Sequence, residues 1–125
     1  MMNLDIEAAK AAQEIINKTA ENKSNEVENL VTKTLGVLQE NGVCACMLYL
    51  YSLNKDASSP EGVTRKKLLK MTELLDKKYE GDDKAESVLK YLTDNICNDI
   101  DALFLTKQLW EQTLIYARYG AKARE

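Results

Sequence analysis

The cysteines are the first residues in this chain whose type could support chemistry. Cys44 and Cys46 form the closest pair, and Cys97 stands alone further along the sequence. On a helix, residues two positions apart point about 200° away from each other, so Cys44 and Cys46 cannot share one tetrahedral metal ion. The chain has no histidine, the commonest metal ligand and acid–base group. We therefore expect three reduced, buried thiols, no metal site and no cofactor.

Acidic side chains gather at Asp82–Asp83 and again at Asp99 and Asp101. Both places precede stretches with helical periodicity, where a carboxylate accepts hydrogen bonds from free amide groups. The spacing of Asp83 and Glu86 predicts a capping box. The sequence contains no phosphate-binding glycine loop, dinucleotide-binding glycine pattern or nucleophile elbow. We predict helix caps rather than catalytic carboxylates, and a protein that has neither enzymatic activity nor a small-molecule substrate.

Basic residues concentrate between positions 65 and 78. At about 100° per residue, Lys66, Lys70 and Lys77 would share one line of a helix, opposite an apolar face. Such a line suits contact with a phosphate backbone, which requires positive charge but no base-reading groups. Glu73 lies within the same stripe and could instead pair with Lys70 and Lys77, which would leave an ordinary solvated face. We predict the three lysines as RNA-binding residues and keep the solvated face as the alternative.

The last predicted helix has apolar residues on two opposite sides. One side carries Phe104, Gln108, Ile115, Tyr119 and Lys122, with Lys107 and Arg118 beside them. Aromatic and apolar side chains edged with Arg and Lys are typical of a protein interface or of a surface that contacts RNA. The alternative is that the bundle wraps this helix on both sides. The other side is predicted to enter the core and holds Leu103, Leu105, Leu109, Trp110, Leu114, Tyr116, Ala117 and Ala121.

Amphipathic periodicity predicts about six helices to position these residues, over approximately 3–22, 25–41, 43–53, 59–79, 83–97 and 99–124. Asn25 and Glu28 have capping-box spacing, Ser59–Pro60 is a typical helix start, and Asn98 or Asp99 would cap the last helix. Residues 43–53 (VCACMLYLYSL) are apolar nearly all round, which predicts a helix in the middle of the bundle. A strand would also fit this short run, but no second strand candidate exists to pair with it.

The composition is that of one globular helical domain. Of 125 residues, 45% are apolar and 30% charged, enough for a single core without disulfides. We predict one all-α domain over residues 1–125, folded as a compact bundle. The net charge of −3 excludes a general attraction to nucleic acid, so RNA contact would need a local basic stripe or a partner. No signal segment or membrane span is evident, which predicts a cytoplasmic protein that does not contact a membrane.

Two stretches of the sequence resemble a known family. Residues 39–43 (QENGV) lead into 47–52 (MLYLYS), and near the C-terminus Leu105–Thr106 is followed by Leu109, Leu114 and residues 117–123 (ARYGAKA). Together they resemble the small all-helical subunit of the Cmr, or type III-B CRISPR, effector complex, the fifth of the Cmr subunit families. In that family an Asn-Gly turn precedes an apolar helix, and the chain closes with a helix that ends in an Arg-aromatic motif. The similarity in length and segment order covers most of the chain.

The resemblance implies a non-catalytic structural subunit of a crRNA-guided complex that targets RNA in antiviral defence. Copies of the chain would stack with one another and with larger Cmr subunits, and would line the groove where target RNA pairs with the guide. Base pairing reads the sequence there, so the protein needs only shape and backbone contacts. Arg118, Tyr119 and Lys122 match the family's C-terminal motif as candidates for RNA or neighbour contact.

The competing hypothesis comes from the residues alone. A helical protein–protein adaptor without any nucleic-acid role would offer the Phe104, Ile115 and Tyr119 face to a partner helix.

Overall fold

The computed structural model describes residues 3–124, so the first two residues and the last residue of the predicted domain lie outside it. The described chain is all-α, as predicted, with no strand. The α-helices are α1 (Leu4–Lys18), α2 (Ser24–Asn41), α3 (Val43–Leu53), α4 (Pro60–Lys70), α5 (Ala85–Asn95) and α6 (Ile100–Ala123), and a 3-10 helix, η1 (Met71–Leu75), follows α4. None of the described helices combines the length and hydropathy that a membrane span requires.

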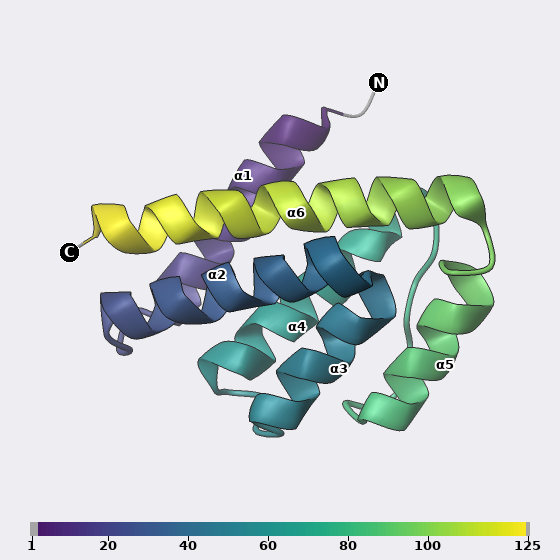
Figure 1. Ribbon diagram of the computed structural model, residues 1–125, viewed down its shortest axis with the longest axis horizontal. Helices are drawn as coiled ribbons and strands as arrows, with labels where there is room; N and C mark the ends of the chain where they lie inside the picture. Colours follow the sequence, from purple (N-terminus) through teal and green to yellow (C-terminus); the bar gives the residue numbers. More distant parts are fainter. Residues whose placement is uncertain (1–2, 125) are drawn as a thin grey trace.

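The longest helix, α6, organises the bundle. It runs across the width of the molecule and packs against α1 and α2, while α3 packs against α2, α4 and α5 (Figure 1). Trp110 lies at the centre of the α6 contact and is fully buried. The predicted core side of α6 is confirmed, because Leu109, Leu114, Ala117 and Ala121 are also buried. Leu103, Leu105 and Tyr116 on the same helix are partly buried.

Two of the predicted helix starts are confirmed by their hydrogen bonds. The Ser59 hydroxyl accepts from the Gly62 amide at 3.0 Å, directly before Pro60. The Asp99 carboxylate accepts from the amides of residues 101 and 102 at 3.1 and 3.2 Å. In both places the cap satisfies amide groups that the first helical turn leaves free. Gly62 cannot carry a side chain, because a Cβ there would lie 2.3 Å from the Asp56 carbonyl oxygen.

The two predicted capping boxes are wrong. The helix α2 begins one residue before Asn25, so that Lys23 occupies the cap position and no side chain caps the helix. Asp83 does not cap α5, whose cap position is taken by Lys84. The physical reason is that the Asp83 carboxylate accepts hydrogen bonds from Tyr51 and Arg65 instead. A tertiary contact has replaced the local one.

The apolar run at residues 43–53 forms a helix, as predicted, but it is not buried all round. Val43, Met47 and Leu50 lie in the core. Leu48 and Leu53 on the same helix are 45% and 46% exposed. The helix α3 therefore packs against α2, α4, α5 and α6 but leaves these two leucines partly uncovered.

The predicted helix over residues 59–79 is wrong at its C-terminal end. The α-helix stops at Lys70, the 3-10 helix follows, and Asp76 adopts the left-handed conformation with φ 61°. Aspartate tolerates this conformation better than most residues. The Thr72 hydroxyl bonds to the Leu69 carbonyl at 2.7 Å, and the Tyr91 hydroxyl donates to the Lys77 carbonyl at 2.8 Å. These contacts turn the chain away from the helix axis and hold it against α5.

The end of α6 is fastened to the turn between α1 and α2. The Arg124 guanidinium donates to the backbone carbonyls of Ile16, Thr19 and Asn22 at 2.8 to 3.0 Å. Its Nε also donates to the Ser24 hydroxyl at 2.9 Å. Arg124 therefore adds charged donors to carbonyl groups at and beyond the end of α1, and connects three helices at one point.

Candidate functional site

The outer face of α6 is the first candidate surface; it comprises Phe104, Gln108, Ile115, Tyr119 and Lys122, spaced three to seven residues apart. Phe104 and Tyr119 are 64% and 62% exposed, while Ile115 is partly buried. The helix packs against α1 and α2 through its other side. The predicted alternative, in which the bundle wraps α6 on both sides, is therefore wrong for Phe104 and Tyr119, whereas Ile115 packs against the core. Two exposed aromatic rings on one helix form a surface suited to a partner.

Two cations, Lys122 on this face and Arg118 beside it, differ in their hydrogen-bond and ion-pair partners. Lys122 lies 3.7 Å from the Glu28 carboxylate on α2. Arg118 is partly buried, and its Nε atom is shielded from solvent without a hydrogen-bond partner in residues 3–124. A buried N–H without an acceptor is costly. Arg118 Nε therefore lacks a partner within the described residues, whereas Lys122 has a carboxylate nearby.

A basic groove between α1 and α4 is the second candidate surface. Lys66 and Lys70 line one wall of a cavity of about 320 Å³, and Lys18 on α1 lines the other. All three side chains are exposed, and none makes an ion pair within residues 3–124. Lys67 also lines the cavity, but its Nζ lies 2.6 Å from the Glu14 carboxylate. The hydrogen bond from Lys67 holds the pKa of Glu14 below its ordinary value, so this acid stays ionised inside the groove.

Lys77 does not join Lys66 and Lys70 on one helical line. The predicted line assumed a continuous helix, which ends at Lys70. Lys77 lies beyond the 3-10 helix, in the segment that its own backbone carbonyl ties to α5. The alternative partner for these lysines, Glu73, makes no ion pair within the described chain. Lys66 and Lys70 thus lie together as predicted, and the third lysine of the groove is Lys18 rather than Lys77.

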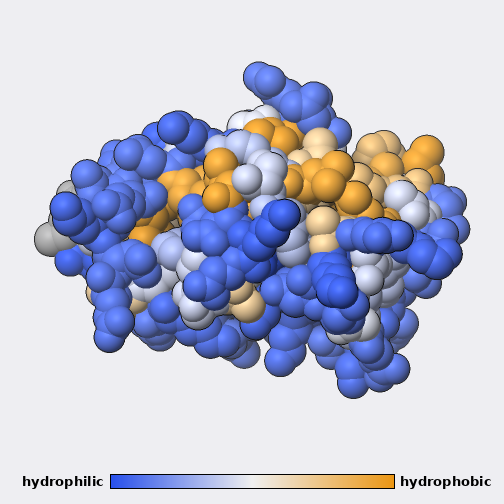
Figure 2. Space-filling model, turned by 90° about the horizontal axis from the view of Figure 1, so that it is seen from below, coloured by the Kyte–Doolittle hydropathy of each residue, from blue (hydrophilic) through white to orange (hydrophobic). Residues whose placement is uncertain are grey.

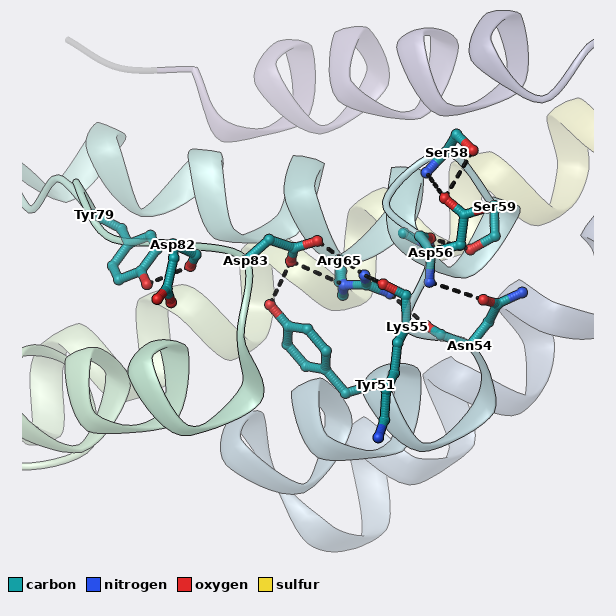
Figure 3. Close-up of polar contacts among 11 residues, drawn as sticks. Tyr51, Asn54, Lys55, Asp56, Ser58, Ser59, Arg65, Tyr79, Asp82 and Asp83 are labelled. Atoms are coloured by element: carbon teal, nitrogen blue, oxygen red, sulfur yellow. Dashed lines mark hydrogen bonds and ion pairs between the residues drawn. The ribbon is translucent and has the colours of Figure 1, made fainter.

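A group of polar contacts surrounds Arg65, which is only 1% exposed (Figure 3). Its guanidinium donates to the backbone carbonyls of Asn54 and Lys55 at 2.6 and 2.9 Å. The Asp83 carboxylate accepts from the same group at 3.1 and 3.3 Å. The guanidinium carbon also lies 4.3 Å from the centre of the Tyr51 ring. Arg65 thus holds the loop before α4 and the segment before α5 against the bundle.

Hydrogen bonds and burial determine the protonation states of Asp83 and Tyr51. Partial burial opposes ionisation of Asp83, but the hydrogen bonds from Arg65 and Tyr51 outweigh it and hold the pKa of this carboxyl below its usual value. Burial and the hydrogen bond to Asp83 raise the pKa of Tyr51 well above its usual value. Asp83 is therefore an ionised acceptor and Tyr51 a neutral donor at neutral pH. Such a group suits the anchoring of two loops rather than proton transfer at neutral pH.

The cysteines are arranged differently from the sequence prediction. Cys46 is fully buried, as predicted, and burial raises the pKa of its thiol to about 12. Cys44 and Cys97 are only partly buried, and their sulfur atoms lie 3.1 Å apart. All three thiols are free, and residues 3–124 contain no group of three or more His, Cys, Asp or Glu side chains that could hold a metal ion.

Exposed apolar surface is not confined to α6. Seen from below, a broken band of apolar surface crosses the upper half of the molecule, with hydrophilic side chains below it and at both ends (Figure 2). Ile6 on α1 and Leu48 and Leu53 on α3 are also about half exposed. The outer face of α6 still differs from these positions, since Phe104 and Tyr119 are more exposed and have cations beside them.

Two important residues were not selected from the sequence. Lys18 belongs to α1, and its proximity to α4 depends on how the helices pack. Arg65 appeared as one cation of a basic stretch, although the structure buries it completely. Its helical position gave the only available signal, because Arg65 lies three residues before Leu68, on the side that enters the core. The sequence itself does not show Asp83 as its partner.

Comparison with known protein families, curated proteins and solved structures finds no match to this chain.

Proposed function

We propose that this chain is a non-catalytic structural subunit of a type III-B, crRNA-guided CRISPR complex that targets RNA. The outer face of α6 attaches it to a larger subunit or a second copy, and the basic groove follows an RNA backbone. The observation that carries the proposal is the exposure of Phe104 and Tyr119 along α6, next to Arg118 and Lys122. Tyr119 and the two cations belong to the motif that resembles the fifth Cmr family.

The outer face of α6 favours a macromolecular partner over a small molecule. Tyr and Arg are enriched in protein interfaces. A tyrosine there buries its apolar ring while its hydroxyl keeps a hydrogen-bond partner. Covering an exposed large apolar side chain contributes about 1.5–3 kcal/mol. Phe104 and Tyr119 can therefore supply a substantial part of the affinity for a partner. The fifteen-residue spacing of the two rings spans about 22 Å along a helix, which fits an extended surface.

The basic groove favours contact with phosphate groups. Lys18, Lys66 and Lys70 approach from two helices and have no carboxylate partner within the described chain. Lysine binds phosphate as a point charge and does not read bases. In a guide-directed complex base pairing supplies the specificity, so a groove of this kind is sufficient. Glu14, which is paired with Lys67, reduces the positive charge and favours moderate rather than tight binding.

A protein–protein adaptor without a nucleic-acid role is the second candidate function. The net charge of −3 and the additional exposed apolar residues on α1 and α3 favour it. The adaptor would use the same outer face of α6, so contact with a protein partner does not distinguish the two functions. Recovery of RNA does.

The test is to purify the tagged chain from its native cells and to identify the proteins and RNA that accompany it. The proposal predicts other type III-B subunits together with RNA of guide length. Treating the same preparation with ribonuclease before elution should release the RNA while the protein subunits stay attached. Recovery of an unrelated protein without RNA would contradict the proposal and favour the adaptor.

A further inference from the structure

Cys44 and Cys97 are brought into direct contact although 53 positions separate them in the sequence. Cys44 lies in the first turn of α3, and Cys97 lies in the turn between α5 and α6. Their sulfur atoms are 3.1 Å apart, and both side chains are partly accessible to solvent. Cys46, by contrast, is fully buried. The fold therefore assembles one accessible pair of thiols from two distant segments.

We propose that Cys44 and Cys97 form a reversible dithiol–disulfide pair, which low-molecular-weight disulfides such as glutathione disulfide oxidise. A disulfide requires the sulfur atoms at about 2.05 Å, so they must approach by about 1 Å. The turn that carries Cys97 is short and lies at the surface, next to the exposed residues 98–100. A movement of this turn by about 1 Å can close the distance between the two sulfur atoms.

The reaction balances with one molecule of the oxidant. The Cys44 thiolate attacks one sulfur of glutathione disulfide, forms a mixed disulfide and releases one glutathione thiolate. Cys97 then loses its proton and attacks the Cys44 sulfur, which releases the second glutathione as a thiolate. The two protein thiols are oxidised to one disulfide, and the reagent is reduced to two thiols. The two protons of the protein thiols end on the two glutathione molecules.

The two cysteines are not equivalent in this reaction. Burial, the hydrogen bond to Cys44 and the charge of Cys44 raise the pKa of Cys97 to about 12. The Cys97 thiol therefore stays protonated as long as Cys44 has not formed a disulfide. Cys44 lies in the first turn of α3. These observations assign the first attack to Cys44 and the resolving step to Cys97.

The disulfide would fasten the part of the bundle with the fewest contacts. The helix α5 packs chiefly against α3. A bond between Cys44 and Cys97 joins α3 directly to the end of α5 and encloses α4 in the loop. Because a cross-link over a long loop restricts the unfolded chain, the oxidised protein should unfold at a higher temperature than the reduced one.

The experiment exposes the full-length protein to glutathione disulfide and then counts free thiols after unfolding. The expected result is a fall from three thiols to one, a mass lower by about 2 Da, and a proteolytic fragment that links Cys44 to Cys97. A reductant should restore three thiols and lower the unfolding temperature again. Three free thiols after oxidation, or a stable mixed disulfide on Cys44, would overturn the proposal.

Single substitutions serve as controls. Cys46→Ala should still form the intramolecular bond, because Cys46 takes no part in the pair. Cys97→Ser removes the resolving thiol and should leave the mixed disulfide on Cys44. Linked fragments that contain Cys46, or dimers joined between two molecules, would assign the oxidation to a different pair and would also contradict the proposal.

Discussion

Arg65 on α4 and Asp83 before α5 form a two-pronged ion pair, with Nε and Nη2 of the arginine 3.3 and 3.1 Å from the two carboxylate oxygens. The arginine is buried and the carboxylate is partly exposed. A buried guanidinium needs such a partner, since an uncompensated charge in the interior is strongly destabilising. This pair ties the segment before α5 to the bundle, and it explains why Asp83 is not available as a helix cap.

Removing the charge of Asp83 should destabilise the fold. We expect Asp83→Asn to lower the free energy of unfolding by about 2 kcal/mol, less than for a fully buried pair because water reaches Asp83. The matched control is Asp82→Asn, because the neighbouring side chain is exposed and accepts no bond from Arg65. Asp82→Asn should change the free energy of unfolding by less than about 0.5 kcal/mol. Equal urea denaturation midpoints for the two variants would contradict the account.

The same pair predicts a dependence on acid. The pKa of Asp83 is lower in the folded protein than its ordinary value of about 3.9. Its contribution to stability is therefore complete above about pH 4 and is lost as the pH falls through the folded pKa, because the unfolded chain takes up the proton first. Urea denaturation from pH 7 to about pH 2 should show a smaller loss for Asp83→Asn than for the wild type. If the free energy of unfolding fell equally with pH in Asp83→Asn and the wild type, Asp83 would not be the source of the acid dependence.

Local patterns predicted the fold class and most helices, and their failures have physical causes. Ser59 and Asp99 cap helices as predicted because their bonds run to neighbouring amides. Asp83 fails as a cap because its partner, Arg65, lies in another helix. The helix after Pro60 ends at Lys70, and the Tyr91 hydroxyl holds the later segment through the Lys77 carbonyl, a contact that periodicity cannot reveal.

The candidate surfaces differ in the same way: residues on one helix could be grouped from the sequence, whereas residues on two helices could not. The outer face of α6 could be predicted because one helix carries all of its residues, so helical spacing alone placed Phe104 and Tyr119 on one side. The basic groove could be predicted only in part. Lys66 and Lys70 belong to one helix, whereas Lys18 reaches them through packing of α1 against α4. Likewise, no spacing rule relates Cys44 to Cys97.

The lysines of the groove should determine how RNA binding depends on salt. We expect the Lys18→Glu, Lys66→Glu, Lys70→Glu variant to weaken binding of target RNA by the assembled complex. Each lost phosphate contact should reduce the slope of log affinity against log salt by about 0.7 for a single strand. Lys33→Glu is the control, since Lys33 is exposed on α2 and does not line the groove. An unchanged slope in the triple variant would show that RNA does not contact the groove. A separate Lys77→Glu variant tests the lysine in the loop after the 3-10 helix by the same measurement.

Arg124 should contribute more to stability than an ordinary residue near a chain end. Arg124→Met removes the guanidinium hydrogen bonds to the carbonyls of Ile16, Thr19 and Asn22. The Ile16 and Thr19 carbonyls each keep a second donor, the Thr19 hydroxyl and the Asn22 amide. We expect a loss of about 2–3 kcal/mol in the free energy of unfolding, measured by urea denaturation. Arg124→Lys keeps the charge but not the fork of donors, so it should lose most of the same stability. A lysine variant as stable as the wild type would show that charge alone is important here.

The most direct test of the central claim compares three tagged chains purified from native cells: the wild type, the Phe104→Ala, Tyr119→Ala variant, and Leu53→Ala as an exposed apolar control on α3. Circular dichroism should show that all three fold. The account predicts that the wild type and Leu53→Ala recover larger type III-B subunits and guide-length RNA. The α6 variant should recover at least about tenfold less of both, because it lacks two exposed rings that the partner would bury, a loss of about 3 kcal/mol or more of binding free energy. Recovery without RNA by the wild type, or undiminished recovery by the α6 variant, would contradict it.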